Sequence, residues 1–206
     1  SNVQNKKYDL DYTSGHHPYG YLTLYNGKFY GLNEEGGDNG SGTMFEWDPA
    51  ANLYTKLVDF NGTNGSHPYG SLSVQNDVLY GLTGLGGNHG AGVIFEWNPA
   101  NRLFTKKFDF NGTNGDYPRG NLACLSNRFY GMTEAGGINN EGVLFEWDPA
   151  TNNFTVKFNM SKDSGSHPYG SLSANGGKLY GMTSEGGTNN DGVIFEWDPA
   201  GNAYTV

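Results

Sequence analysis

The tripeptide Phe45-Glu46-Trp47 decides the fold of this chain, because it returns at a constant spacing of 50 residues. The later copies end at Trp97, Trp147 and Trp197. A tetrapeptide around Pro18 and a double glycine at 36–37 recur with the same period. Self-similarity at a period of roughly 20 to 50 residues is typical of repeat proteins, in which each unit buries its apolar face against its neighbours. The sequence therefore predicts four equal units that form a single domain over residues 1–206.

Each unit contains four segments with strand character, and helical periodicity is seen in none of them. In the first unit these segments are residues 21–25, 28–32, 43–47 and 53–60. Asn26-Gly27 between the first two is a hairpin signal, and the third ends before a proline, which cannot donate to a sheet. The expected fold is therefore all-β, a β-propeller of four four-stranded blades. The blades are expected at residues 17–60, 67–110, 117–160 and 167–206.

The composition agrees with this fold class and argues against some classes of binding partner. The 206 residues include 33 glycines, with 15% aromatic and 16% charged residues, which suits short strands, tight turns and aromatic layers between sheets. The formal net charge of −9 argues against a nucleic-acid partner, because phosphate binding needs clustered Lys and Arg. No apolar stretch approaches the roughly 20 residues of a membrane span. We also see no signal peptide, so we expect either a cytoplasmic protein or a mature secreted form.

Several motifs resemble known repeats. The second unit reads Leu79-Tyr80-Gly81-Leu82-Thr83, then Gly86-Gly87, then Gly92-Val93-Ile94-Phe95. This order is similar to the GloVer tandem repeat of bacterial surface and secreted proteins. The double glycine, followed by Trp47 and by an aromatic residue seven positions later at Tyr54, also resembles the kelch repeat. The resemblance implies a propeller module at the surface or outside of a bacterial cell. Asn33 departs from the pattern, at a place where the other units have threonine.

The two ends of the chain are expected to share one blade. Residues 7–12 align with the segment that starts at Lys157, and Val206 aligns with Val156, so the two ends together spell one complete fourth strand. Open sheet edges invite aggregation, which favours closure. We therefore expect residues 7–12 to complete the blade at 167–206 and to close the ring in a monomer. The alternatives are two chains that pair into an eight-bladed ring, or a segment of a longer array.

The longer loops of each unit should lie on one face of the propeller. They are the loop between the second and third strands, residues 34–42 in the first unit, and the loop that leads into the next unit, residues 61–67. Long loops rich in Gly and Asn carry function more often than tight hairpins do, so we expect the ligand site at their rim. The candidate ligand-binding residues are His17, His67, Tyr117, His167, Tyr19, Tyr69, Arg119, Tyr169, Asn39, His89, Asn139 and Asn189.

These residue types indicate binding rather than catalysis. Aromatic rings stack on sugar faces, and imidazoles and Arg119 can donate hydrogen bonds, so the expected ligand is a carbohydrate or a protein. The competing interpretation is structural: the prolines fix the path into each blade, the tyrosines pack between blades and the histidines cap turns. Neither a metal nor a cofactor is expected, because no carboxylate at a fixed local spacing accompanies the histidines.

The predicted function is therefore a non-catalytic binding or scaffold module. The alternative is a structural or protein-interaction module without a small ligand, whether natural or engineered. An enzyme such as a propeller lyase is the least supported, because no nucleophile, base and orienting group can be named.

Overall fold

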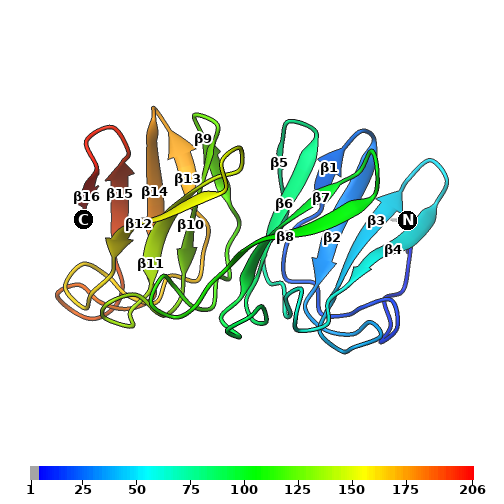
Figure 1. The fold of residues 1–206 in the computed structure, drawn as a ribbon, viewed down its shortest axis with the longest axis horizontal. Helices are drawn as coiled ribbons and strands as arrows, with labels where there is room; N and C mark the ends of the chain where they lie inside the picture. Colours follow the sequence, from blue (N-terminus) through cyan, green and yellow to red (C-terminus); the bar gives the residue numbers. More distant parts are fainter. Residues whose placement is uncertain (1–4) are drawn as a thin grey trace.

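The computed structural model describes residues 5–206, which form four antiparallel sheets of four consecutive strands each (Figure 1). We number these sheets blade 1 to blade 4 in chain order. The strands are β1 (Thr23–Tyr25), β2 (Lys28–Asn33), β3 (Thr43–Asp48) and β4 (Leu53–Asp59) in blade 1; β5 (Ser73–Gln75), β6 (Val78–Thr83), β7 (Val93–Asn98) and β8 (Leu103–Asp109) in blade 2; β9 (Ala123–Leu125), β10 (Arg128–Thr133), β11 (Val143–Asp148) and β12 (Asn153–Asn159) in blade 3; and β13 (Ser173–Asn175), β14 (Lys178–Met182), β15 (Ile194–Asp198) and β16 (Ala203–Thr205) in blade 4. The all-β architecture of four four-stranded blades is confirmed. Over residues 5–206 the structure contains no helix that is long and apolar enough to cross a membrane.

Local sequence sets the register within each blade. Asn26 and Gly27 both have positive φ, 47° and 75°, as the two-residue turn between β1 and β2 requires. In the β2–β3 ladder Gly31 lies opposite Phe45. A Cβ atom on Gly31 would overlap the ring of Phe45, so the absence of a side chain at Gly31 leaves the space that this ring occupies. The same glycine–phenylalanine pairing recurs in each of the other blades, at Gly81–Phe95, Gly131–Phe145 and Gly181–Phe195.

The hydrophobic core lies between blades rather than inside them. Leu32 and Met44 of blade 1 are buried in one cluster with Leu72 and Phe95 of blade 2. Phe60, in the segment between these two blades, is fully buried and meets Phe95 edge to face, with ring centroids 5.4 Å apart. Burial of one such side chain stabilises the fold by about 1.5–3 kcal/mol. A single blade has no comparable core, so each blade depends on its neighbours.

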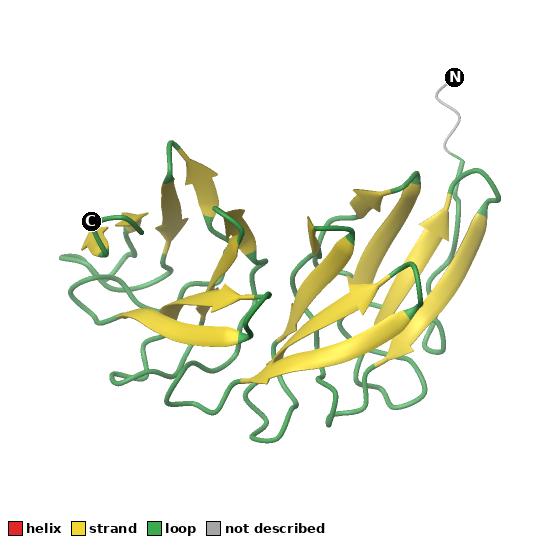
Figure 2. Cartoon of the chain, turned by 45° about the horizontal axis from the view of Figure 1, so that its top comes forward, coloured by secondary structure: helices red, strands yellow, loops and turns green. Residues whose placement is uncertain are grey.

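The expected closure of the ring is not formed in this structure. Residues 7–12 pair with no strand, and β16 pairs only with β15. Blade 1 and blade 4 lie at opposite ends of the molecule (Figure 1), and the four blades form an open arc (Figure 2). Tyr8 stacks on Tyr54 of blade 1 at 4.2 Å, as Phe158 stacks on Tyr204 of blade 4 at 3.9 Å. Residues 7–12 are therefore held against the far flank of blade 1 by packing, and they cannot complete blade 4 of the same arc.

The two end flanks expose side chains that the internal blades bury. Met182 and Ile194 of blade 4 are 63% and 72% exposed, whereas the equivalent Leu82 and Ile94 of blade 2 are 2% and 0% exposed. At the other end Leu22 is 50% exposed. The flanks of blades 1 and 4 are thus the two halves of a blade–blade interface that is not formed in the arc, and residues 7–12 cover part of the blade 1 half.

Candidate functional site

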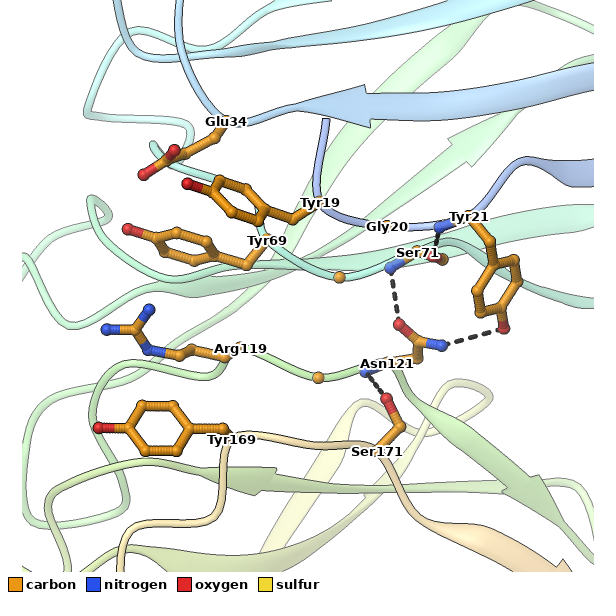
Figure 3. Close-up of a pocket in the computed structure, with 12 residues that line it drawn as sticks. Tyr19, Gly20, Tyr21, Glu34, Tyr69, Ser71, Arg119, Asn121, Tyr169 and Ser171 are labelled. Carbon is orange, nitrogen blue, oxygen red and sulfur yellow. Dashed lines mark hydrogen bonds between the residues drawn. The ribbon is translucent and has the colours of Figure 1, made fainter. Parts of the chain in front are cut away.

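The segments that lead into the innermost strands line a cleft of about 690 Å³ on the concave side of the arc (Figure 3). Each segment follows a loop from the preceding unit and ends at β1, β5, β9 or β13. Side chains from all four units therefore meet in one place. The lining residues are Tyr19, Gly20, Tyr21, Glu34, Tyr69, Gly70, Ser71, Arg119, Gly120, Asn121, Tyr169 and Ser171.

A hydrogen-bond ladder fixes the spacing of these segments. The backbone N–H of Tyr21 donates to Ser71 Oγ at 2.7 Å, that of Ser71 donates to Asn121 Oδ1 at 2.6 Å, and that of Asn121 donates to Ser171 Oγ at 2.8 Å. Asn121 also donates from Nδ2 to the hydroxyl of Tyr21, at 2.9 Å, which joins blade 3 to blade 1. Each rung links one unit to the next, so the four segments that enter the inner strands are held side by side.

Four of the sequence-predicted residues form a row along one edge of the cleft, and we call this row the rim stack: Tyr19, Tyr69, Arg119 and Tyr169. Their side chains point in the same direction (Figure 3). The rings of Tyr19 and Tyr69 lie 5.8 Å apart, and the guanidinium of Arg119 lies 4.7 Å from the ring of Tyr69 and 5.1 Å from that of Tyr169. These distances suit cation–π contact on both sides of the arginine. The structure thus brings these four predicted residues together.

Carboxylates hold the rim stack in place. The Nε–H of Arg119 donates to Glu134, and Glu34 lies beside Tyr69 with only 8% of its surface exposed. Burial, together with hydrogen bonds to Tyr117 and Glu34, raises the pKa of Tyr69. The negative charge of Glu134 raises the pKa of Tyr169. Both phenols therefore remain neutral at physiological pH and can act as donors as well as acceptors.

The histidines predicted for the rim are not among the residues that line the cleft. His17, His67, Tyr117 and His167 all have positive φ, between 51° and 60°. The backbone N–H of His67 donates to Ser41 O of blade 1, and its carbonyl accepts from the N–H of Gly84 in its own blade, both at 2.9 Å. This position therefore ties neighbouring blades together through its backbone, which fits the structural interpretation. A ligand-binding role for these four side chains stays a prediction.

The other four predicted residues are exposed at loop tips away from the cleft. Asn39, His89, Asn139 and Asn189 belong to the loops between the second and third strands of the blades. In blade 1 the N–H of Asp38 donates to Asp59 Oδ1 at 2.9 Å, so this loop folds toward the outermost strand. None of the four lines the cleft.

Sequence reasoning missed Glu34 and Asn121 of the cleft lining, and Glu134, which pairs with Arg119. Glu34 and Glu134 occupy the place that is Gly84 and Ser184 in the other units, so variation among units was the available signal. Asn121 carries a similar signal, because the corresponding residue is serine in blades 2 and 4. Departures from an otherwise strict repeat mark residues whose role differs between blades.

Comparison with known proteins places the chain in context. A family model described as Gloeobacter/Verrucomicrobia repeat matches residues 3–162. A search of curated proteins finds no match.

Several solved structures share the propeller-like fold. They include TolB from Acinetobacter baumannii (TM-score 0.56, 13% identity, 87% of this chain and 40% of that one), the nidogen/laminin complex (0.59, 14%, 87% and 58%) and a puromycin-hydrolyzing peptidase of Mycobacterium tuberculosis (0.58, 13%, 93% and 28%). The chain spans less than two thirds of each of these structures. At such low identity the likeness concerns the fold alone.

Proposed function

The chain belongs to the Gloeobacter/Verrucomicrobia repeat family, and on that premise we propose that its arc of four blades is a non-catalytic module that binds carbohydrate in the cleft. The observation that carries the proposal is the rim stack. Three tyrosine rings and one arginine stand in a row on one wall of the cleft. Aromatic faces pack against the C–H faces of sugars, while phenol, guanidinium and carboxylate groups satisfy sugar hydroxyls.

The size and charge of the cleft favour a neutral sugar. A volume of about 690 Å³ falls within the roughly 300–1,000 Å³ that small-ligand sites occupy. Glu134 offsets the charge of Arg119, and Glu34 adds a further negative charge. The chain as a whole carries a formal charge of −9. An acidic sugar would meet net repulsion, whereas a neutral one would find both donors and acceptors.

A non-catalytic role is supported by how the cleft carboxylates are used. Glu134 pairs with Arg119, and Glu34 lies against Tyr69, so both hold binding side chains in place. The resemblance of the motifs to repeats of bacterial surface and secreted proteins supports a location outside the cell, where glycans are accessible ligands.

A glycan array followed by titration calorimetry tests the proposal. Wild type is expected to bind at least one neutral glycan. Tyr69→Ala should weaken that binding roughly tenfold or more, because removal of an aromatic residue that stacks on a ligand ring costs about 1–3 kcal/mol, the value known for nucleobases. His89→Ala is the matched control, because His89 is exposed at a loop tip outside the cleft. Absence of binding to every neutral glycan, or equal binding by wild type and Tyr69→Ala, would reject the carbohydrate function.

A second candidate function, association between copies of this chain, is favoured by the exposed end flanks. Met182 and Ile194 of blade 4 correspond to residues that pack against the next blade. Leu22 of blade 1 corresponds to Leu72 of blade 2, which is buried against the preceding blade. A second copy therefore carries a surface that is complementary to each flank. Head-to-tail interfaces close into a ring when their rotation allows it. The occupant we propose is a second copy, which gives two arcs in one ring.

The solution mass of the 206-residue chain decides whether it is a monomer or a ring of two arcs. A ring of two arcs has twice the monomer mass of 22.4 kDa, and Met182→Glu combined with Ile194→Glu should return it to the monomer mass. A wild-type protein that stays monomeric at high micromolar concentration would contradict the association. This result would leave the carbohydrate proposal intact, because the cleft is lined by one chain.

A further inference from the structure

His16 and Glu35 face each other across an antiparallel bridge at the start of blade 1. The backbone N–H of His16 donates to Glu35 O at 2.9 Å, and that of Glu35 donates to His16 O at 3.2 Å. Residues directly opposite in such a pair project their side chains from the same face of the sheet. The backbone therefore holds one imidazole and one carboxylate side by side.

His17 brings a second imidazole to the same carboxylate. Its Nδ1 lies 3.4 Å from Glu35 Oε2, and the Nδ1 of His16 lies 3.8 Å from that oxygen. The two imidazole rings meet edge to face, with centroids 4.4 Å apart. Among the residues described, one ligand atom from each of the three side chains lies within 4.8 Å of the other two. The backbone of His17 is fixed at φ 54°, and its carbonyl accepts from the N–H of Glu34 at 3.1 Å, so this second imidazole is also positioned in advance.

This spacing fits a small transition-metal ion. Ligand atoms that bind a tetrahedral ion at about 2.0–2.1 Å lie roughly 3.3 Å from one another. The two nitrogen–oxygen distances need only small side-chain rotations to reach that value. Imidazole with carboxylate is a donor set for zinc and its neighbours, whereas calcium and magnesium take oxygen ligands almost exclusively. We infer that His16, His17 and Glu35 form a site for one divalent transition-metal ion of the zinc class.

A further pair of groups adjoins this site on its inner side. Glu34 and His67 each place a ligand atom within 4.8 Å of the carboxylate of Glu35. The Nδ1 of His67 is buried without a hydrogen-bond partner among residues 5–206. A buried polar atom without a partner is unusual in folded proteins and calls for a specific cause. The Nδ1 of His167, at the same position of blade 4, also lacks a hydrogen-bond partner within the described part of the chain, so this feature belongs to the repeat position and the proposed site rests on His16, His17 and Glu35.

The repeat itself shows that the donor set is peculiar to blade 1. The positions of His16, His17 and Glu35 hold Ser, His and Leu in blade 2, Asp, Tyr and Ala in blade 3, and Ser, His and Glu in blade 4. Blade 4 therefore lacks only the second imidazole, and it serves as a control within the same chain. The proposed site takes one ion per chain rather than two.

The test is titration of chelator-treated protein with ZnCl2 by calorimetry, together with the visible absorption spectrum of the Co²⁺-loaded protein. Wild type is expected to bind one ion with low-micromolar or tighter affinity and to give the absorption of a low-coordinate cobalt site. His16→Ser and Glu35→Leu introduce the residues of blade 2, which already fit this backbone, and each should weaken binding at least tenfold. His89→Ala removes an exposed histidine elsewhere and should change nothing.

Three results would overturn the inference: no binding by wild type at 100-fold excess of ZnCl2 over protein at about 10 μM, unchanged affinity in both His16→Ser and Glu35→Leu, or two equal ions per chain. Circular dichroism of each variant establishes that it is folded before its affinity is compared. The Co²⁺ spectrum separates a defined site from loose surface binding, because only directly coordinated imidazole and carboxylate shift the visible bands.

Discussion

The guanidinium of Arg119 lies 4.5 Å from the ring of Tyr117, the residue two positions before it in the same unit. Tyr117 in turn shares a hydrogen bond between hydroxyls with Tyr69, at 3.1 Å. Arg119 is therefore enclosed by the rings of Tyr69, Tyr117 and Tyr169 and is paired with Glu134. Its Nε is used by Glu134, so the terminal nitrogens remain available for a ligand in the cleft. The replacement of the rim tyrosine by Arg119 in the third unit therefore gives the cleft a preferred centre.

Replacement of Arg119 by tyrosine should separate stacking from hydrogen bonding in the cleft. Tyrosine is the residue of the other three units, so Arg119→Tyr is expected to fold, with a lower melting temperature because Glu134 loses its ion pair. Glycan binding should fall about tenfold or more, because a hydrogen bond to a charged group contributes about 1.5–3 kcal/mol. Calorimetry with the glycan found for wild type measures the change. Undiminished affinity would show that Arg119 does not contact the sugar.

His167→Asn tests whether the left-handed positions outside the cleft lining take part in binding. Asparagine tolerates positive φ, and His167 has φ 51°, so the fold should be retained. Because His167 does not line the cleft, glycan affinity is expected to stay within about twofold of wild type. A loss as large as that of Tyr69→Ala would instead support the ligand-binding role predicted for this histidine from the sequence.

Gly31→Ala should destabilise the protein strongly. The new Cβ would overlap the ring of Phe45 on the neighbouring strand, and forcing an extra methyl group into such a site costs about 1–3 kcal/mol. Urea denaturation measures the free energy of unfolding. Gly201→Ala is the control, since its Cβ would meet no atom closer than 3.6 Å and should leave the stability unchanged. Equal stability of both variants would contradict the packing described for the β2–β3 ladder.

The ion pairs of the blades predict a stability loss in acid. Burial alone would raise the pKa of Glu46, but hydrogen bonds from Lys28 (2.6 Å) and Tyr30 (2.7 Å) lower it overall. Because its pKa is lower in the folded state, Glu46 contributes stability above its unfolded pKa of about 4.3, and this contribution is lost as the pH falls through the folded value.

The melting temperature of wild type should therefore fall more steeply between about pH 5 and pH 3 than that of Glu46→Gln. Asp163→Asn, which changes an exposed residue, should follow the wild-type curve. Parallel curves for wild type and Glu46→Gln would show that this carboxylate does not contribute to the acid sensitivity.

The sequence was sufficient to predict the blades, because strict repetition, hairpin turns and the prolines after β3, β7, β11 and β15 act locally. Of the twelve candidate residues, Tyr19, Tyr69, Arg119 and Tyr169 line the cleft, since their side chains follow directly from the path of the chain into each inner strand. Ring closure was predicted wrongly. The fit of residues 7–12 to the end of blade 4 shows that the two segments have similar sequence, but the curvature of the arc decides whether they can meet. The curvature of the arc arises from all blade–blade contacts together, and no local sequence motif predicts it.

The histidines illustrate a second limit. Their recurrence suggested ligands, whereas the structure shows that the backbone of His67 joins two blades through its N–H and carbonyl groups. Conversely, the approach of His16 to Glu35 joins residues 19 positions apart in the chain, a spacing that matches no metal-binding motif. Pairings of this kind depend on the bridge between two loops and become visible only in three dimensions.

Side-chain NMR during titration with a neutral glycan tests the central claim most directly, because it reports which wall of the arc the ligand touches. The proposed function predicts that the ring signals of Tyr69 and Tyr169 and the guanidinium signal of Arg119 shift in a saturable way. The signals of the exposed loop-tip residues Asn39 and Asn189 should stay in place. Saturable shifts confined to the loop tips, with the rim stack unchanged, would contradict the account.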